Sequence, residues 1–362
     1  MKKILLALAI FIGVLLLSAF LYFQLSACGI APWSCGDYSS GQTGNTHKIQ
    51  VGSGPEDMAI DTSTGSSRII VSCVERRKKA EESWGFYQIY PASNSSRPLK
   101  VLPEGLRIFP HGIDVETIDG IPYLYAISHD RLDNAIEHRI YRFHIMEDTL
   151  VLDDSFTLEH PSLTGPNDID VLEDGSFYVS NPMPSDNPNE TAKAIVGVKN
   201  GSVLHYDGQG NWKTVLDDMC YPNGVWVNRE ASCLVVANGG CQTVERYPIQ
   251  ENGELIVHEG SSTREHGIDI PIGDNLMMDE SGILWTAAHP CPLKFLSHAK
   301  HSHKSSPVQI FAIDPVTMKT HLVFQNNGDL INAASTALRI DDRLYISQVF
   351  DPFVLVVEGI DL

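Results

Sequence analysis

The chain has 362 residues with 45 acidic and 26 basic side chains, which gives a formal net charge of −19 at neutral pH. This charge repels a phosphate backbone, so nucleic acid is excluded as an expected partner. Hydrophobic residues make up 43% of the chain, enough for a packed core and too many for intrinsic disorder. The seven cysteines contain no Cys-x-x-Cys pair, which argues against a zinc site of that kind.

The N-terminus carries two lysines and then an apolar run over residues 4–23. Twenty helical residues rise roughly 30 Å, the thickness of a bilayer core. Residues 1–28 are therefore expected to be a signal peptide or a membrane anchor, and the protein to be secreted or membrane-anchored outside the cytoplasm. The tetrapeptide at 25–28 also resembles a bacterial lipobox. Sequons at Asn94 and Asn189 would accept glycans in a eukaryotic secretory pathway.

The rest of the chain divides into two parts. Residues 29–46 are rich in Gly, Ser and Thr and predict a linker, which leaves residues 47–362 as the folded domain. Cys220, Cys233 and Cys241 lie close together in the sequence of that domain. Outside the cytoplasm a disulfide bond between two of them is expected, with the pairing left open.

A short pattern recurs through this domain: a turn marked by Pro or Gly and polar residues, then an alternating apolar stretch. Copies begin at Pro55, Pro110, Pro166, Pro222 and Gly273, with a degenerate copy from Ala333. In several copies a turn such as Asp119-Gly120 leads into a second β-rich stretch, and no segment after the apolar run has a helical period. About 53 residues per copy suits four antiparallel strands. The sequence therefore predicts an all-β, six-bladed β-propeller.

The repeats predict a ring of polar side chains. If the same turn precedes the innermost strand of every blade, these turns meet at one end of the central tunnel. They contain Glu56, Asp57, His111, Asn167, Asp168, Asn223, Asp274 and Asn275. Converging hard oxygen donors without a thiolate favour Ca²⁺ over zinc. Any one Asn or Asp has a turn-forming role as its alternative, but matching donors in five turns predict a metal site.

Two histidines are expected to lie near this ring. His111 lies in the turn before one strand, and His129 follows the return strand of the hairpin that turns near Asp119-Gly120. Because the two strands have similar lengths, the hairpin brings both histidines to the same end. Histidine is also the natural general base near neutral pH.

The order and spacing of six motifs carry a resemblance that runs from about Val51 to Phe350. They are Pro-Glu-Asp at 55–57, Phe-Pro-His-Gly-Ile at 109–113, Ser-His at 128–129, Pro-Asn-Asp-Ile at 166–169, Pro-Asn-Gly at 222–224 and Gly-Asp-Asn at 273–275. Together they resemble the paraoxonase/arylesterase family of calcium-dependent lactonases. The resemblance implies two calcium ions. It assigns a catalytic ion to Glu56, Asn167, Asn223, Asp274 and Asn275, and a structural ion to Asp57, Asp168 and the backbone carbonyl of Ile113.

The resemblance also implies an activity and leaves alternatives open. It implies hydrolysis of lactones and aryl esters, with organophosphates as promiscuous substrates, through a calcium-polarised carbonyl and a water activated by His111 with His129. The chain has no Gly-x-Ser-x-Gly elbow, which argues against a serine hydrolase. The alternatives are a non-catalytic membrane-anchored chaperone or binding propeller and a gluconolactonase-type lactonase with one metal ion.

Three positions bear on how far the resemblance extends. His289 resembles a family histidine at the rim of the active site, with a plain loop residue as the alternative. The segment equivalent to the family's lid, residues 74–85, is highly charged here, so substrate preference does not carry over. The C-terminus lacks the cysteine that fastens the propeller in animal members, so closure is expected from strand pairing and packing.

Overall fold

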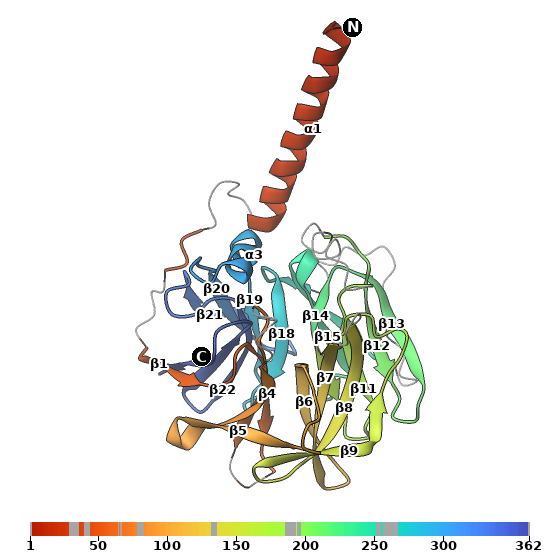
Figure 1. Ribbon diagram of the computed structural model, residues 1–362, viewed down its shortest axis with the longest axis vertical. Helices are drawn as coiled ribbons and strands as arrows, with labels where there is room; N and C mark the ends of the chain where they lie inside the picture. Colours follow the sequence, from red (N-terminus) through yellow and green to blue (C-terminus); the bar gives the residue numbers. More distant parts are fainter. Residues whose placement is uncertain are drawn as a thin grey trace.

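A computed structural model describes residues 2–28, 36–39, 44–63, 65, 67–77, 83–131, 136–184, 193, 197–250, 255 and 267–360. The first element is the helix α1 (Lys2–Cys28), which projects from the β-rich body (Figure 1). Its residues 2–21 are long and apolar enough to cross a membrane, with a mean hydropathy of 3.0 and none of the span buried. A helical apolar run at the N-terminus was expected.

The body is built almost entirely of strands. Their bounds are β1 (Thr46–Gln50), β2 (Pro55–Asp61), β3 (Arg68–Val74), β4 (Trp84–Tyr90), β5 (Ser95–Leu102), β6 (Pro110–Ile118), β7 (Ile121–Arg131), β8 (Ile136–Ile145), β9 (Thr149–Leu158), β10 (Ile169–Val171), β11 (Phe177–Asn181), β12 (Gly201–Tyr206), β13 (Trp212–Met219), β14 (Pro222–Asn228), β15 (Cys233–Asn238), β16 (Thr243–Pro248), β17 (Gly267–Asp269), β18 (Gly273–Met278), β19 (Leu284–Ala288), β20 (Val308–Ile313), β21 (Thr320–Asn326), β22 (Ala334–Ile340), β23 (Arg343–Gln348) and β24 (Phe353–Glu358). The remaining elements are the helix α3 (Pro292–Lys300) and two short 3₁₀ helices, η1 (Pro91–Ser93) and η2 (Gly239–Cys241). The nine-residue α3 is too short for its period to stand out in the sequence.

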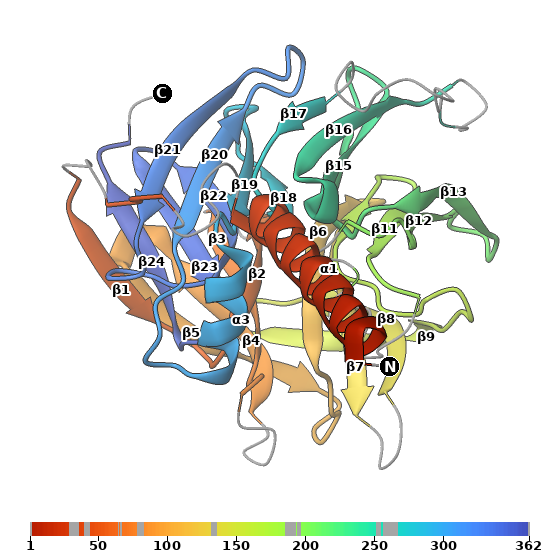
Figure 2. The same ribbon diagram turned by 90° about the horizontal axis from the view of Figure 1, so that it is seen from above.

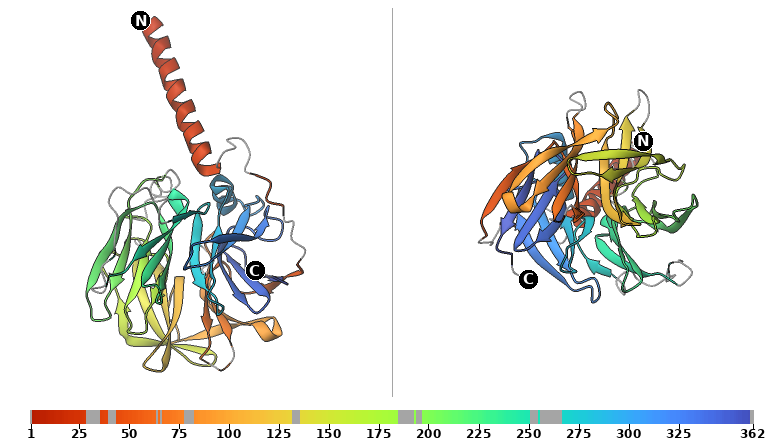
Figure 3. Two further views of the ribbon diagram at one scale, coloured as in Figure 1. Left: turned by 180° about the vertical axis from the view of Figure 1, so that it is seen from behind. Right: turned by 90° about the horizontal axis from the view of Figure 1, so that it is seen from below.

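The strands form four sheets of four strands and one of eight. The eight-stranded sheet consists of two antiparallel halves, β2 to β5 and β6 to β9, joined where β5 pairs with β9 in parallel. Seen from above and from below, the sheets lie side by side around the centre of the body (Figures 2 and 3). The expected all-β fold is confirmed, and the fusion of two repeats through their outer strands was not expected.

The first strands of successive repeats form the inner ring. The strands β2, β6, β10, β14, β18 and β22 contact one another in that order, and β22 contacts β2. In all of these except β10, the pairing with the next strand slips by a bulge near the N-terminal end. A bulge bends the strand and re-aims its side chains. The candidate ligands thus lie on or just before the N-terminal ends of inner strands, which are bulged in all but β10, although the sequence predicted the preceding turns.

The ring is closed by strand pairing, as expected from the missing C-terminal cysteine. The strand β1 pairs antiparallel with β24, the outermost of the last three strands, from Thr46 opposite Val357 to Gln50 opposite Phe353. Cys220 and Cys241 form a disulfide bond near the start of β14, and Cys233 is a buried free thiol. One of the pairings left open is therefore identified. Cys291 is disulfide-bonded as well.

A buried arginine links the two halves of the eight-stranded sheet. Arg68 and Asp61 are almost fully buried, with Nε of Arg68 2.7 Å from Oδ2 of Asp61. The guanidinium also donates hydrogen bonds to the side chain of Gln88 and to the backbone carbonyls of Met146 and Glu147, between β8 and β9. The charge of Arg68 is buried, so the folded state is stable only while the Asp61 carboxylate remains beside it.

We expect Asp61→Asn to lower the free energy of unfolding by about 3 kcal/mol, since it leaves a buried guanidinium without a counter-charge. Urea denaturation measures the change. Asp154→Asn makes the same replacement at an exposed position of β9 and serves as the control, with an expected change within about 0.5 kcal/mol. Equal stability of the two variants would contradict this account of Arg68.

Candidate active site

The inner strands bring the predicted oxygen donors to one cavity. It has a volume of about 160 Å³, and its floor includes Glu56, Asn167, Asn223 and Asp274. Asn275 lies just beside them, because its side-chain amide donates to Oε1 of Glu56 at 3.3 Å and to the hydroxyl of Thr336 at 2.9 Å. The structure therefore assembles the five residues assigned to the first ion.

Most of these residues present a buried oxygen with no hydrogen-bond partner among the described residues: Oε2 of Glu56 and the Oδ1 atoms of Asn167, Asn223 and Asn275. A buried acceptor left unsatisfied costs roughly 1–3 kcal/mol. Four such atoms in one place call for a ligand that accepts electron pairs, and oxygen-only donation is what Ca²⁺ prefers. The residues fit a calcium ion.

The site depends on amide oxygens. Among the described residues, no three His, Cys, Asp or Glu side chains lie close enough together to hold a metal ion by themselves. The Asn side chains of the floor complete the donor set, and neutral amide donors limit the negative charge that must be buried. A search for clustered carboxylate, imidazole and thiolate groups alone would therefore miss a site that depends on amide oxygens.

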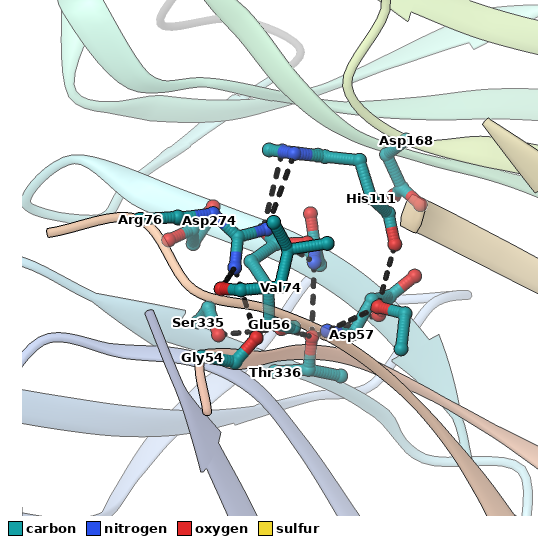
Figure 4. Close-up of polar contacts among 12 residues, drawn as sticks. Gly54, Glu56, Asp57, Val74, Arg76, His111, Asp168, Asp274, Ser335 and Thr336 are labelled. Carbon is teal, nitrogen blue, oxygen red and sulfur yellow. Dashed lines mark hydrogen bonds and ion pairs between the residues drawn. The ribbon is translucent and has the colours of Figure 1, made fainter. Parts of the chain in front are cut away.

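Burial shapes the charge of the floor. The pKa of Glu56 lies well above its ordinary value because the carboxyl is buried, and Asp274 and Asp57 raise it further, while Arg76 opposes the shift (Figure 4). Burial also raises the pKa of Asp57 from 3.8 to about 6. Burial and the nearby Asp57 raise the pKa of Asp168 well above its ordinary value. A divalent cation would favour the ionised forms.

The residues assigned to the second ion already join neighbouring inner strands. Oδ2 of Asp57 accepts a hydrogen bond from the backbone N–H of Ile113 at 2.7 Å, and Oδ2 of Asp168 accepts one from Val225 at 2.9 Å. Oδ1 of Asp57 accepts from the Thr336 hydroxyl at 2.8 Å. Asp57 therefore connects β2 to β6 and β22, and Asp168 connects the start of β10 to β14. An ion here would have to share oxygens with backbone N–H groups.

The two predicted histidines lie together, as the hairpin argument expected. Their ring centroids are 4.8 Å apart, with the rings edge to face. Nε2 of His111 is 3.6 Å from Oε1 of Glu56, and its Nδ1 is 3.4 Å from the Arg76 guanidinium. Burial and the neighbouring His129, Arg76 and His138 hold the pKa of His111 well below its ordinary value. His111 is therefore neutral near pH 7 and able to accept a proton.

The structure adds residues that the sequence did not indicate. Arg76, from the charged segment after β3, lies against His111 and donates to the backbone carbonyls of Gly54 and Val74 (Figure 4). Residues 78–82 of the predicted lid lie outside the described residues.

His289 lines the cavity and contacts Asp274, with Nε2 2.8 Å from Oδ2. The structure therefore favours a position of His289 at the active site over that of a plain loop residue.

The walls of the cavity are largely apolar. They are formed by Tyr221, Ile272, Pro292, Phe295, Leu296 and Val349. Three of these come from the start of α3, so this short helix covers one side of the polar floor. A cavity with an oxygen-rich floor and hydrocarbon walls suits a small molecule that has a polar reacting group on an apolar body.

Comparison with known proteins identifies the family. Residues 95–355 match the arylesterase family. The chain belongs to that family. A further relative is serum paraoxonase/arylesterase 2 of Gallus gallus, with 24% identity over 251 residues. The alignment covers 67% of this chain and 66% of the relative, so the chain spans slightly less than two thirds of that protein's length.

Solved structures of low sequence identity share the fold. A luciferin-regenerating enzyme aligns with a TM-score of 0.55 at 14% identity, over 88% of this chain and 96% of that one. A gluconolactonase from Xanthomonas campestris aligns at 0.52 and 16%, over 85% and 87%. The calcium-binding protein regucalcin from Agrobacterium tumefaciens aligns at 0.50 and 13%, over 86% and 96%. These likenesses support a propeller-like architecture for an arylesterase-family chain.

The unpartnered oxygens predict a measurable effect on calcium affinity. We expect Asn223→Ala to weaken calcium binding by at least about 10-fold, because it removes one of the four unsatisfied acceptors. Isothermal titration measures the affinity. Asn228→Ala, at the far end of the same strand, is the control, since Oδ1 of Asn228 accepts a hydrogen bond from the Ala231 N–H. Equal affinities in the two variants would remove Asn223 from the ligand set.

The raised carboxyl pKa values predict a pH dependence of stability. Between its unfolded pKa of 3.8 and its folded pKa of about 6, Asp57 holds a proton that the unfolded chain has lost. Its contribution to stability is therefore full below about pH 4 and is lost as the pH rises through 6. For the calcium-depleted protein we expect a decline of about 3 kcal/mol from this group, because one pKa unit corresponds to about 1.4 kcal/mol.

Excess calcium should remove much of this decline, because the cation binds the ionised carboxylates. Denaturant unfolding from about pH 4 to about pH 8, with and without calcium, makes the comparison. Two parallel pH profiles would show that the buried carboxylates do not bind the ion.

Proposed function

We propose that this chain is a calcium-dependent hydrolase of lactones and aryl esters, built on a six-bladed propeller. The eight-stranded sheet counts as two blades joined through β5 and β9, which gives six with the other four sheets. The observation that carries the proposal is the group of four buried, unpartnered oxygens beside the buried imidazole of His111. The family and the gluconolactonase neighbour support ester or lactone hydrolysis in general.

The first ion would be held by Glu56, Asn167, Asn223, Asp274 and Asn275. When bound, calcium supplies a positive charge that polarises a carbonyl and stabilises the developing oxyanion. The neighbour regucalcin, a calcium-binding protein, supports this choice of metal. We propose a second, structural ion at Asp57, Asp168 and the carbonyl of Ile113, since the raised pKa of Asp168 reflects two buried carboxyls near each other.

His111 is placed to act as the general base. It lines the cavity beside Glu56, and its neutral state near pH 7 leaves a nitrogen able to take a proton from an attacking water. His129 packs edge-on against its ring and orients it. The guanidinium of Arg76, 3.4 Å from Nδ1 of His111, disfavours the protonated form of the ring.

The walls determine which substrates fit. Phe295 and Leu296 of α3 contact the space above the polar floor and would bind the hydrocarbon part of a lactone or the ring of an aryl ester. His289, held by Asp274, is the polar group on that side. The same floor could hold the phosphoryl oxygen of an organophosphate, which we propose as a promiscuous substrate.

The remaining assignments concern cellular location. We propose that residues 1–28 are a signal peptide or membrane anchor, that 29–46 are a linker and that 47–362 form the propeller. Asn94 is exposed at a left-handed position just before β5 and is open to glycosylation. Asn189 lies outside the described residues.

Hydrolysis by the full chain in detergent tests the function. We expect turnover of γ- and δ-lactones and of phenyl acetate that disappears with excess EDTA and returns when calcium is restored, because the floor loses its cation on chelation. A pH-stat or an absorbance assay measures the rate. A folded, calcium-loaded protein without turnover would contradict the proposal and favour a binding or chaperone role.

His111→Gln tests the base. We expect a loss of turnover of at least about 100-fold, the contribution typical of a general base. Calcium affinity and melting temperature should stay close to wild type, because the amide keeps the polarity of the position. His205→Gln, on β12 away from the cavity, serves as the control. Substantial activity in the His111 variant would exclude it as the base.

A further inference from the structure

A third histidine continues the row formed by His111 and His129. His138 on β8 lies directly opposite His129 on β7 in the strand register. The Nδ1 atoms of these two rings are 2.7 Å apart, which is a hydrogen bond between one protonated and one unprotonated nitrogen. The ring centroids are 4.8 Å apart, the same spacing as between His111 and His129. The three imidazoles therefore form a chain across three adjacent strands.

This chain leads outward from the inner ring. The strand β6 carries His111 into the tunnel, and β7 and β8 follow it toward the outside of the sheet. His138 is partly exposed, and β8 begins two residues earlier at Ile136, whose side chain is 44% exposed. One end of the row thus lies at the reacting centre and the other near solvent.

The opposite face of the same two strands is held rigid by charged groups. Asp130 accepts hydrogen bonds from Ser128 at 2.5 Å, Arg139 at 2.8 Å and Tyr141 at 2.7 Å. Arg139 also pairs with Glu137 at 2.5 Å. Because side chains alternate along strands, this network and the histidine pair occupy opposite faces. It fixes the register that brings His129 and His138 together.

The charged groups around the histidine row are mostly cationic. Arg76 lies beside His111, and Arg131, which follows His129 on β7, donates to the carbonyl of Glu75. These guanidinium groups repel positive charge in the row. Glu56, 3.6 Å from His111, is the acidic group at the inner end. Electrostatic repulsion therefore favours the departure of a proton that enters the row.

We propose that His138 is a positioning and relay residue that orients His129 and passes the proton released by hydrolysis from the tunnel to solvent. The inference rests on the proposed function. Opening a lactone with water forms a hydroxycarboxylic acid, which at neutral pH is a carboxylate and one proton. That proton must leave the site in every turnover.

The transfer balances over the two rings. Protonated His129 gives the proton on its Nδ1 to the Nδ1 of His138, which becomes the imidazolium, and His138 then releases the proton on its Nε2 to water. The bond between the two Nδ1 atoms is left with donor and acceptor exchanged, and both rings must change tautomer before the next transfer. No oxidant, reductant or further reactant is needed.

His138→Gln tests the relay. We expect kcat for a lactone to fall about 10-fold, less than for loss of the base itself, with KM and calcium affinity unchanged. His144→Gln is a matched control: His144 lies six residues along on the same face of β8 and contacts the ring of Tyr123. We expect it to keep wild-type kinetics. A wild-type kcat in the His138 variant would overturn the inference.

Buffer rescue separates a relay from a purely structural role. In His138→Ala we expect turnover to rise with the concentration of added imidazole, because a free base replaces the missing acceptor, whereas the wild type should not respond. Reduced turnover without rescue would show a structural role only and overturn the relay. Nitrogen NMR of the histidine rings adds a readout that needs no activity: His138→Gln should change the tautomer of His129.

The outcomes also separate this inference from the proposed function. An inactive wild type would contradict the hydrolase, and an unchanged His129 tautomer in the variant would contradict the positioning role as well. An active wild type with an unaffected His138 variant would leave the hydrolase standing and reject only the relay.

Discussion

Four buried oxygens that have no hydrogen-bond partner within the described part of the chain set the physical constraint on this protein. Leaving them unsatisfied costs several kcal/mol in total, and the carboxyl of Glu56 adds the cost of burying a charge. A cation that takes only oxygen donors offsets both costs at once. The raised pKa of Glu56, the neutral His111 and the central position of the cavity are all consequences of gathering these donors on a closed ring of strands.

The ring must resist the repulsion that its carboxylates create. Bulges at the ends of the inner strands turn donors toward the cavity, at the expense of regular pairing there. Asp57 and Asp168 replace part of the lost strand pairing, because each accepts a hydrogen bond from a backbone N–H of the neighbouring inner strand. The same residues therefore connect strands and contribute negative charge, and binding of the proposed ion would couple the stability of the fold to the occupancy of the site.

The polar, apolar and histidine-lined parts of the site lie on different sides of it. Its floor is polar, its walls carry the apolar residues of α3, and the row from His111 to His138 runs sideways toward solvent. In the proposed mechanism, substrate and proton therefore take separate routes. An antiparallel sheet makes this arrangement possible because residues far apart in the sequence stand directly opposite each other on neighbouring strands.

The sequence by itself determined the all-β repeats, the apolar N-terminal run, the family resemblance and the donors of the floor, because turn motifs and period-two stretches are local patterns. It also predicted that His111 and His129 meet, since a hairpin of known turn fixes its register. It did not reveal Arg76, the contact of His138 with His129 or the covering by α3. Those depend on strand register and on how one short helix packs. Only the tertiary structure decides these, because cross-strand and inter-sheet distances are not encoded in any local spacing.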